Sequence, residues 1–134
     1  MGKRVWLVVF LYFLFPSLVG AQCLQYEPQV SKLNGTISRK TFPGRPNYES
    51  TALGDTSETV WILHLARPIC VAEGEGGINE AVKGVGSVQL VLSSDQYKTY
   101  KDKVGKPVTA TGTLFHSHTG HHHTKVLLTV SDLE

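Results

Sequence analysis

Two strand-like runs joined by a histidine-rich segment constrain the fold of this chain most strongly. Val108–Phe115 (VTATGTLF) and Val126–Val130 (VLLTV) are rich in the Val, Thr, Leu and Phe residues that suit a pleated sheet. Gly120 lies between them and can adopt the positive φ angle that a tight reversal needs. We therefore predict an antiparallel hairpin. The connecting segment carries His116, His118, His121, His122 and His123.

The register of this hairpin decides which histidines share a face. A two-residue loop at Thr119–Gly120 would place four imidazoles on one face, with opposed Cβ atoms about 4.5–5.5 Å apart. Those four are His116, His118, His121 and His123. Such an arrangement would be a ready-made site for a divalent metal ion.

A three-residue loop at Thr119–His121 is the register that we favour. It aligns Leu114 with Val126, so apolar residues face apolar residues, whereas a slip of one residue would turn the apolar set to the wrong face. His118 then pairs with His122. The histidines on one face are His116, His118 and His122, and His123 lies on the other face.

The histidine tract predicts a metal site for zinc, copper or nickel, because neutral imidazole is a good ligand for all three ions. Three imidazoles and one open position form a common kind of zinc site. The alternative is a polar hairpin tip at which histidines are merely tolerated. The candidate ligands are His116, His118, His121, His122 and His123.

The N-terminus has the pattern of a secretory signal peptide. Lys3 and Arg4 precede the uncharged run Val5–Phe15, and small residues lead to Ala21, after which we expect cleavage. The apolar run is too short for a transmembrane helix, and Gln22 stands where a lipoprotein needs a small residue. We therefore divide the chain into a signal peptide at 1–21 and one domain at 22–134, without a stable membrane anchor and located in the periplasm or outside the cell.

The charge balance of the exported chain argues against nucleic acid as a partner. Losing Lys3 and Arg4 reduces the 13 basic residues to the number of acidic residues, 11. A chain with no net positive charge lacks the excess that neutralises phosphates. The two cysteines, Cys23 and Cys70, are expected to form one disulfide, because an exported protein matures in an oxidising compartment.

Five strands and one helix complete the expected architecture. Val30–Ile37, Val60–Leu65 and Val85–Leu92 read as the first three strands, with a bulge at Gly35 and a stop at Pro68. Between the third and fourth strands, Ser93–Lys103 reads as a capped helix of about three turns. A helix at this place in a mainly β chain is the layout of a five-stranded OB-fold-like barrel.

An OB fold binds its ligands on the face of strands 2 and 3, between the loop joining strands 1 and 2 and the loop joining strands 4 and 5. Here these loops are the proline-rich segment 38–59 and the histidine segment 116–123. Phe42, Arg45 and Tyr48 are the candidate ligand-binding residues of the first loop, and they can equally serve as packing anchors.

The exported region resembles a bacterial exported family, domain of unknown function 4431. The matching stretches are PGRPNYES and GD within 43–55, VWILHLARPICV at 60–71, QLVL at 89–92 and GKPVTATGTLFHSHTGHHHTKVLL at 105–128. The resemblance implies a small exported bacterial protein with an OB-like barrel, and it implies no activity.

These patterns favour a small binding module over an enzyme. Its ligand would be a metal ion, a glycan or an envelope protein, held between 38–59 and 116–123. One alternative is a metal-dependent hydrolase, whose general base must come from outside the histidine tract, such as Glu49, Asp55 or Glu58. Another is an inhibitor or accessory factor of an envelope enzyme.

Overall fold

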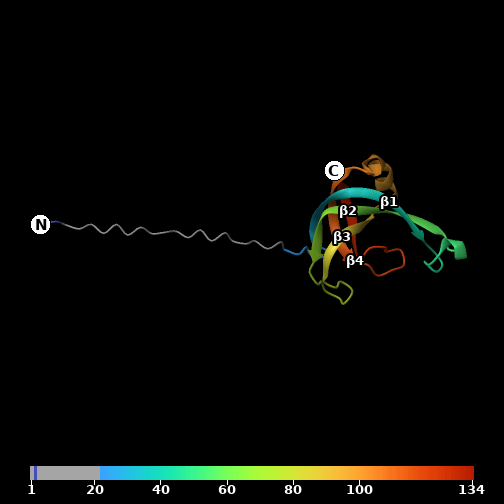
Figure 1. Cartoon of the computed structure of the whole chain (residues 1–134), viewed down its shortest axis with the longest axis horizontal. Helices are drawn as coiled ribbons and strands as arrows, with labels where there is room; N and C mark the ends of the chain where they lie inside the picture. The colour runs from blue at the N-terminus through green and yellow to red at the C-terminus, as the bar shows by residue number, and fades with distance from the viewer. Residues whose placement is uncertain (1, 3–21) are drawn as a thin grey trace.

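The computed structural model describes residue 2 and residues 22–134, so the expected signal peptide lies outside the described residues apart from residue 2. Five strands close into a barrel in the order β1-β2-β3-β5-β4. Figure 1 labels β1, β2, β3 and β4. Only β3 and β5 pair in parallel; the other neighbours are antiparallel. The strands are β1 (Val30–Pro43), β2 (Ser57–Val71), β3 (Val82–Val91), β4 (Pro107–His116) and β5 (Val126–Leu133).

The mainly β class and the single helix between the third and fourth strands are confirmed. Helix α1 (Ser94–Tyr100) is followed by the 3₁₀-helix η2 (Lys101–Lys103), so the predicted long helix ends early as an α-helix. Ser93 and Gln96 form a capping box at its N-terminus. The Ser93 hydroxyl accepts from the N–H of Gln96, and the Gln96 side-chain oxygen accepts from the N–H of Ser93. Another 3₁₀-helix, η1 (Thr51–Leu53), lies in the loop between β1 and β2.

The core fills the barrel with residues that alternate along each strand. Leu63, Val88, Leu114 and Leu128 have no exposed surface, and each comes from a different strand. Burying an aliphatic side chain of this size contributes about 1.5–3 kcal/mol. Trp61 extends the core to the helix, where Tyr97 meets it edge-on with ring centroids 5.1 Å apart. The inward face of every strand is thus fixed by its apolar positions.

The first two strands extend beyond their predicted ends. β1 continues past Ile37 to Pro43, and β2 begins at Ser57, so the loop between them is 44–56 rather than 38–59. Pro68 does not end β2, because the strand accommodates it in an irregular stretch where its register with β3 shifts after His64. Residues 38–43 and 57–59, which the sequence assigned to the loop, therefore belong to the sheet.

The bulge predicted at Gly35 is wrong. Gly35 pairs in regular register with Leu65 on one side and Val108 on the other. A Cβ atom there would lie 2.2 Å from the carbonyl oxygen of His64, so the position needs glycine for the close approach of a neighbouring strand. The absence of a side chain, rather than an extra residue, explains this glycine.

The hairpin is confirmed, but its predicted register is wrong. Leu114 pairs with Leu128 and His116 with Val126, so the loop spans residues 117–125 instead of three residues. The shift of two residues preserves which side chains face the core, because strand side chains alternate with a period of two. Apolar alternation alone could therefore not distinguish this register from the one expected.

The predicted disulfide between Cys23 and Cys70 is present, with their Cα atoms 4.7 Å apart. Leu24 continues the attachment, since its N–H donates to the Cys70 carbonyl and its own carbonyl accepts from the N–H of Ala72. The segment before β1 is thereby fixed to the end of β2. Among the described residues, no helix is long and apolar enough to cross a membrane.

Candidate functional site

The loop 117–125, here called the histidine loop, folds back onto the outer face of the barrel. Ile62, Gln89 and Leu127 are neighbours in register on β2, β3 and β5, and they point away from the core. All three are nevertheless buried. Gln89 holds the loop over them, since its Nε2 donates to the carbonyl of His121 and its Oε1 accepts from the N–H of His123.

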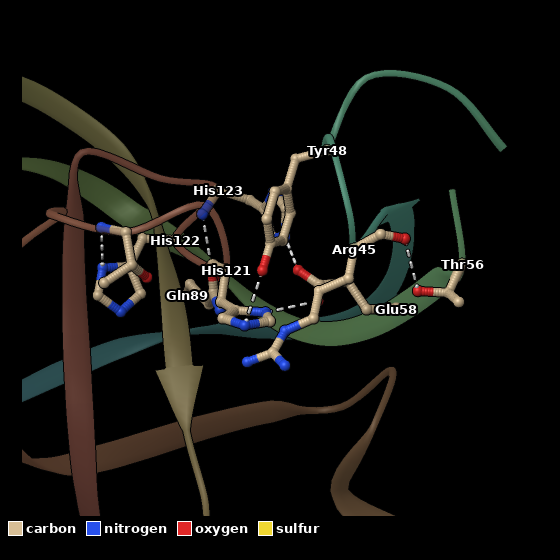
Figure 2. A network of polar contacts seen from close by, with 9 residues as sticks. Arg45, Tyr48, Thr56, Glu58, Gln89, His121, His122 and His123 are labelled. Carbon is tan, nitrogen blue, oxygen red and sulfur yellow. Dashed lines mark hydrogen bonds and ion pairs between the residues drawn. The ribbon is translucent and has the colours of Figure 1, made fainter. Parts of the chain in front are cut away.

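Glu58 is the centre of the polar contacts beneath this loop (Figure 2). One carboxylate oxygen lies 2.7 Å from Nδ1 of His121, and the other lies 2.5 Å from Nε2 of His123. The His123 side chain is 11% exposed and that of His121 is 48% exposed. Phe42, opposite Glu58 in the register, stacks on His123 with ring centroids 3.9 Å apart. Two imidazoles of one loop thus converge on one carboxylate of the sheet.

The ionisation of Glu58 reflects these neighbours. Burial raises the pKa of Glu58, but the hydrogen bonds from His123 and His121, with the attraction of their charges, lower it to a net value below the usual one. The carboxylate is therefore ionised near neutral pH. An ionised carboxylate is also the form in which glutamate binds a metal ion.

Tyr48 contacts the same cluster from the loop between β1 and β2. Its hydroxyl lies 3.0 Å from Nε2 of His121, the ring nitrogen that does not contact Glu58 (Figure 2). A Cβ atom on Gly120 would lie 2.8 Å from the Tyr48 ring, so glycine allows this close contact. Tyr48 has a φ of 59°, the only positive value at a non-glycine residue in the described part of the chain. Such backbone conformations concentrate at functional sites.

Asp55 fixes the turn that presents Tyr48. Its buried carboxylate accepts hydrogen bonds from the backbone N–H groups of Asn47, Glu49 and Ser50, at 2.8–2.9 Å. The N–H groups of Ser50, Glu49 and Asn47 hold the pKa of the Asp55 carboxyl below its usual range. Asp55 therefore supports the turn, and of the three carboxylates considered as a base only Glu58 meets the histidines.

The other predicted ligands, His116, His118 and His122, lie in two places away from Glu58. Nδ1 of His122 accepts from the N–H groups of His118 and Thr119, and the His118 and His122 rings meet edge-on at 4.7 Å. Burial lowers the pKa of His122, and the charges of neighbouring histidines lower it further. His116 instead bonds through Nδ1 to the carbonyl of Ser117. The predicted set of His116, His118 and His122 on one face is therefore not assembled.

The two loops meet, as the sequence predicted, and bring some but not all of the candidate ligand residues together. Phe42 and Tyr48 each contact a histidine ring. Arg45 contributes its backbone carbonyl, which accepts from the N–H and the hydroxyl of Thr56. Within residues 22–134, no group of three or more His, Cys, Asp or Glu side chains already surrounds a point where a metal ion fits.

Part of this site lies in a stretch that matches a known family. Residues 87–134 match the family model described as Domain of unknown function (DUF4431). The resemblance inferred from the sequence is confirmed over this range. The DUF4431 match includes the histidine loop and Gln89, whereas Glu58 and Tyr48 precede it. No curated protein matches the chain.

Proposed function

We propose that Glu58, His121 and His123 bind one divalent transition-metal ion, with zinc, copper and nickel as the candidates. The supporting observation is that both oxygens of the Glu58 carboxylate contact imidazole nitrogens from a single loop. Two histidines and one glutamate are a donor set that zinc uses when a fourth position stays open. The metal-binding prediction thereby moves from the favoured set of His116, His118 and His122 to His121 and His123, joined by Glu58.

Binding requires a small opening of the cluster. Metal–ligand bonds of about 2.0–2.2 Å place neighbouring donor atoms roughly 3 Å or more apart, whereas the Glu58–His123 contact is 2.5 Å. Rotation of the carboxylate can provide the extra space, because Glu58 lies on the outer face of β2 and 22% of its side chain is exposed. Each neutral imidazole would bind the ion through the nitrogen that faces Glu58 and carry its N–H on the other ring nitrogen, and binding weakens at low pH because a protonated imidazole is not a ligand.

Tyr48 and Phe42 are suited to orient the two imidazoles. A metal-binding histidine commonly donates its other ring N–H to a second group, which fixes the ring. Tyr48 lies at that position for His121, and the Phe42 ring stacks flat against His123. The metal would thus be held by the sheet and the histidine loop, with the β1–β2 loop as support.

The proposed setting is a small exported binding module. We propose cleavage after Ala21 and a mature domain at 22–134, in the periplasm or outside the cell. The Cys23–Cys70 disulfide supports a non-cytoplasmic setting. A glycan or envelope-protein ligand, the hydrolase alternative and the inhibitor alternative stay predictions.

Calorimetric titration of tag-free protein with zinc, copper and nickel salts tests the metal site. We expect one ion per chain for at least one metal, and a loss of affinity of more than about tenfold in Glu58→Gln and in His123→Ala. His64→Ala is the matched control, because His64 lies on the same outer face of β2 and its ring nitrogens form hydrogen bonds with Ser38 and Ser87 instead of with Glu58. Weak binding at several sites, or equal affinity in Glu58→Gln and wild type, would contradict the proposal.

A further inference from the structure

A second candidate binding site lies where β1 and β2 separate. β1 pairs with β2 only from Gly35 onward, while its preceding residues pair with β4 alone. β2 continues beyond Leu65 along β3, and its register shifts between His64 and Ile69. The two strands therefore diverge beyond the Gly35–Leu65 pair and leave a groove between them. Arg67 lines this groove and lies nine residues after Glu58 on β2.

The groove has the size and lining of a small-molecule site. Its volume is about 480 Å³, within the range of about 300–1,000 Å³ that such sites occupy. Leu33, Leu65 and Ile69 supply apolar walls, and all three pack with the barrel core. Their packing limits their movement, so the apolar part of the groove is formed before a ligand arrives.

Two cations line the same groove without an anionic partner. Lys32 stands on the β1 side and Arg67 on the β2 side, and no Asp or Glu belongs to the lining. Among residues 22–134, the only ion pairs join Glu58 to His121 and His123. The positive charges of Lys32 and Arg67 are therefore available to an anionic group of a ligand. The rest of such a ligand would have to be apolar to match the apolar walls.

The β2 side of the groove is fixed by covalent and hydrogen bonds. Cys70 belongs to the lining and forms the disulfide with Cys23. Leu24, which also lines the groove, bonds to the backbone of Cys70 and Ala72. These attachments fix the end of the strand segment that carries Arg67 to residues 23 and 24. The opening is thus part of the folded barrel.

We propose that this groove binds a small organic anion with an apolar body, such as a medium-chain or aromatic carboxylate or sulfonate. The anionic group lies between Lys32 and Arg67, and the apolar body covers Leu33, Leu65 and Ile69. This site is separate from the metal cluster and does not depend on it, because it shares no residue with Glu58 and its histidines.

Fluorescence titration with 8-anilinonaphthalene-1-sulfonate, an anion with an apolar body, tests the groove. We expect saturable binding to the folded mature domain, and displacement by decanoate but not by decanol. Lys32→Glu combined with Arg67→Glu should weaken binding by at least about tenfold, since two charge-assisted contacts are lost. Lys98→Glu with Lys101→Glu is the control, because it reverses the same charge on exposed positions of the helical segment.

Two results would overturn this inference. One is unchanged affinity in the Lys32→Glu/Arg67→Glu variant, provided that its unfolding midpoint shows a folded domain. The other is equal displacement by decanol, which would show that the anionic group is not recognised. Repeating the titration with Glu58→Gln separates the two proposals, because that change should leave dye binding unaltered.

Discussion

At the scale of single residues, Asp55 determines where Tyr48 lies. The Asp55 carboxylate is buried and accepts three backbone N–H groups, two of which belong to the neighbours of Tyr48, the residue with positive φ. Without these bonds the buried Asp55 carboxylate would have no partner and the turn would lose the contacts that hold its conformation. The contact between Tyr48 and His121 therefore depends on Asp55, whose carboxylate bonds to the backbone of the residues around Tyr48.

Asp55→Asn should destabilise the protein at neutral pH and remove part of its acid sensitivity. The folded-state pKa of Asp55 lies below its unfolded value of 3.8, so its stabilisation is complete above about pH 3.8 and is lost as the pH falls through the folded-state pKa. Urea unfolding at a series of pH values measures this. Asp102→Asn, on the exposed η2 segment, is the control. A pH profile identical in Asp55→Asn and wild type would show that Asp55 does not act in this way.

At the scale of strands, some glycines are required because a neighbouring strand lies too close for a side chain, and others have room for one. Gly35 and Gly112 lie in β1 and β4, and a Cβ atom at either would meet a backbone carbonyl oxygen of the next strand at 2.2 Å or less. Gly86 in β3 has open space around the same atom and no positive φ. The three positions look alike in the sequence but differ in packing.

Gly35→Ala and Gly112→Ala should each cost about 3 kcal/mol or more in free energy of unfolding, because backbone atoms must move to admit the methyl group. Gly86→Ala should change it by less than about 0.5 kcal/mol. Guanidinium unfolding of the three variants measures the difference. Comparable losses in all three would mean that the spacing between strands is not what selects glycine.

Local pattern predicted the elements of this fold, but long-range contacts decided their lengths and the loop. The start of α1 near Ser93 and the apolar alternation of the hairpin strands are local signals, and the structure confirms both elements. The histidine loop takes its path from Gln89 and Glu58, which belong to other strands. No pattern within residues 117–125 contains that information.

The candidate site was predicted in part. Phe42, Tyr48, His121 and His123 were named from the sequence, whereas Glu58 was named only as one possible base. A signal was available, because Glu58 is in phase with Val60 and Ile62 on the outward face of β2. The predicted loop boundary at residue 59 concealed it, since the strand continues to Ser57. Correct strand ends would have placed this carboxylate on the sheet.

At the scale of the whole molecule, the disulfide should contribute a large part of the stability. It closes a span of 47 residues, which in the chain-entropy model is worth about 4 kcal/mol. The Cys23→Ser/Cys70→Ser variant should therefore unfold at a much lower guanidinium concentration, with the barrel otherwise retained. Circular dichroism and unfolding curves measure both. A loss below about 1 kcal/mol would mean that Leu24 and the backbone bonds hold this end without the cross-link.

The divergence of β1 and β2 also bears on how copies of this chain behave at high concentration. Closed barrels remove the unpaired strand edges on which other chains can add a strand and begin to aggregate. The groove is where the ladder between β1 and β2 is open, and Lys32, Arg67 and Pro68 are residue types that discourage strand addition at such an edge. The charges suited to attract a small anion are thus also suited to keep a second copy of the chain away.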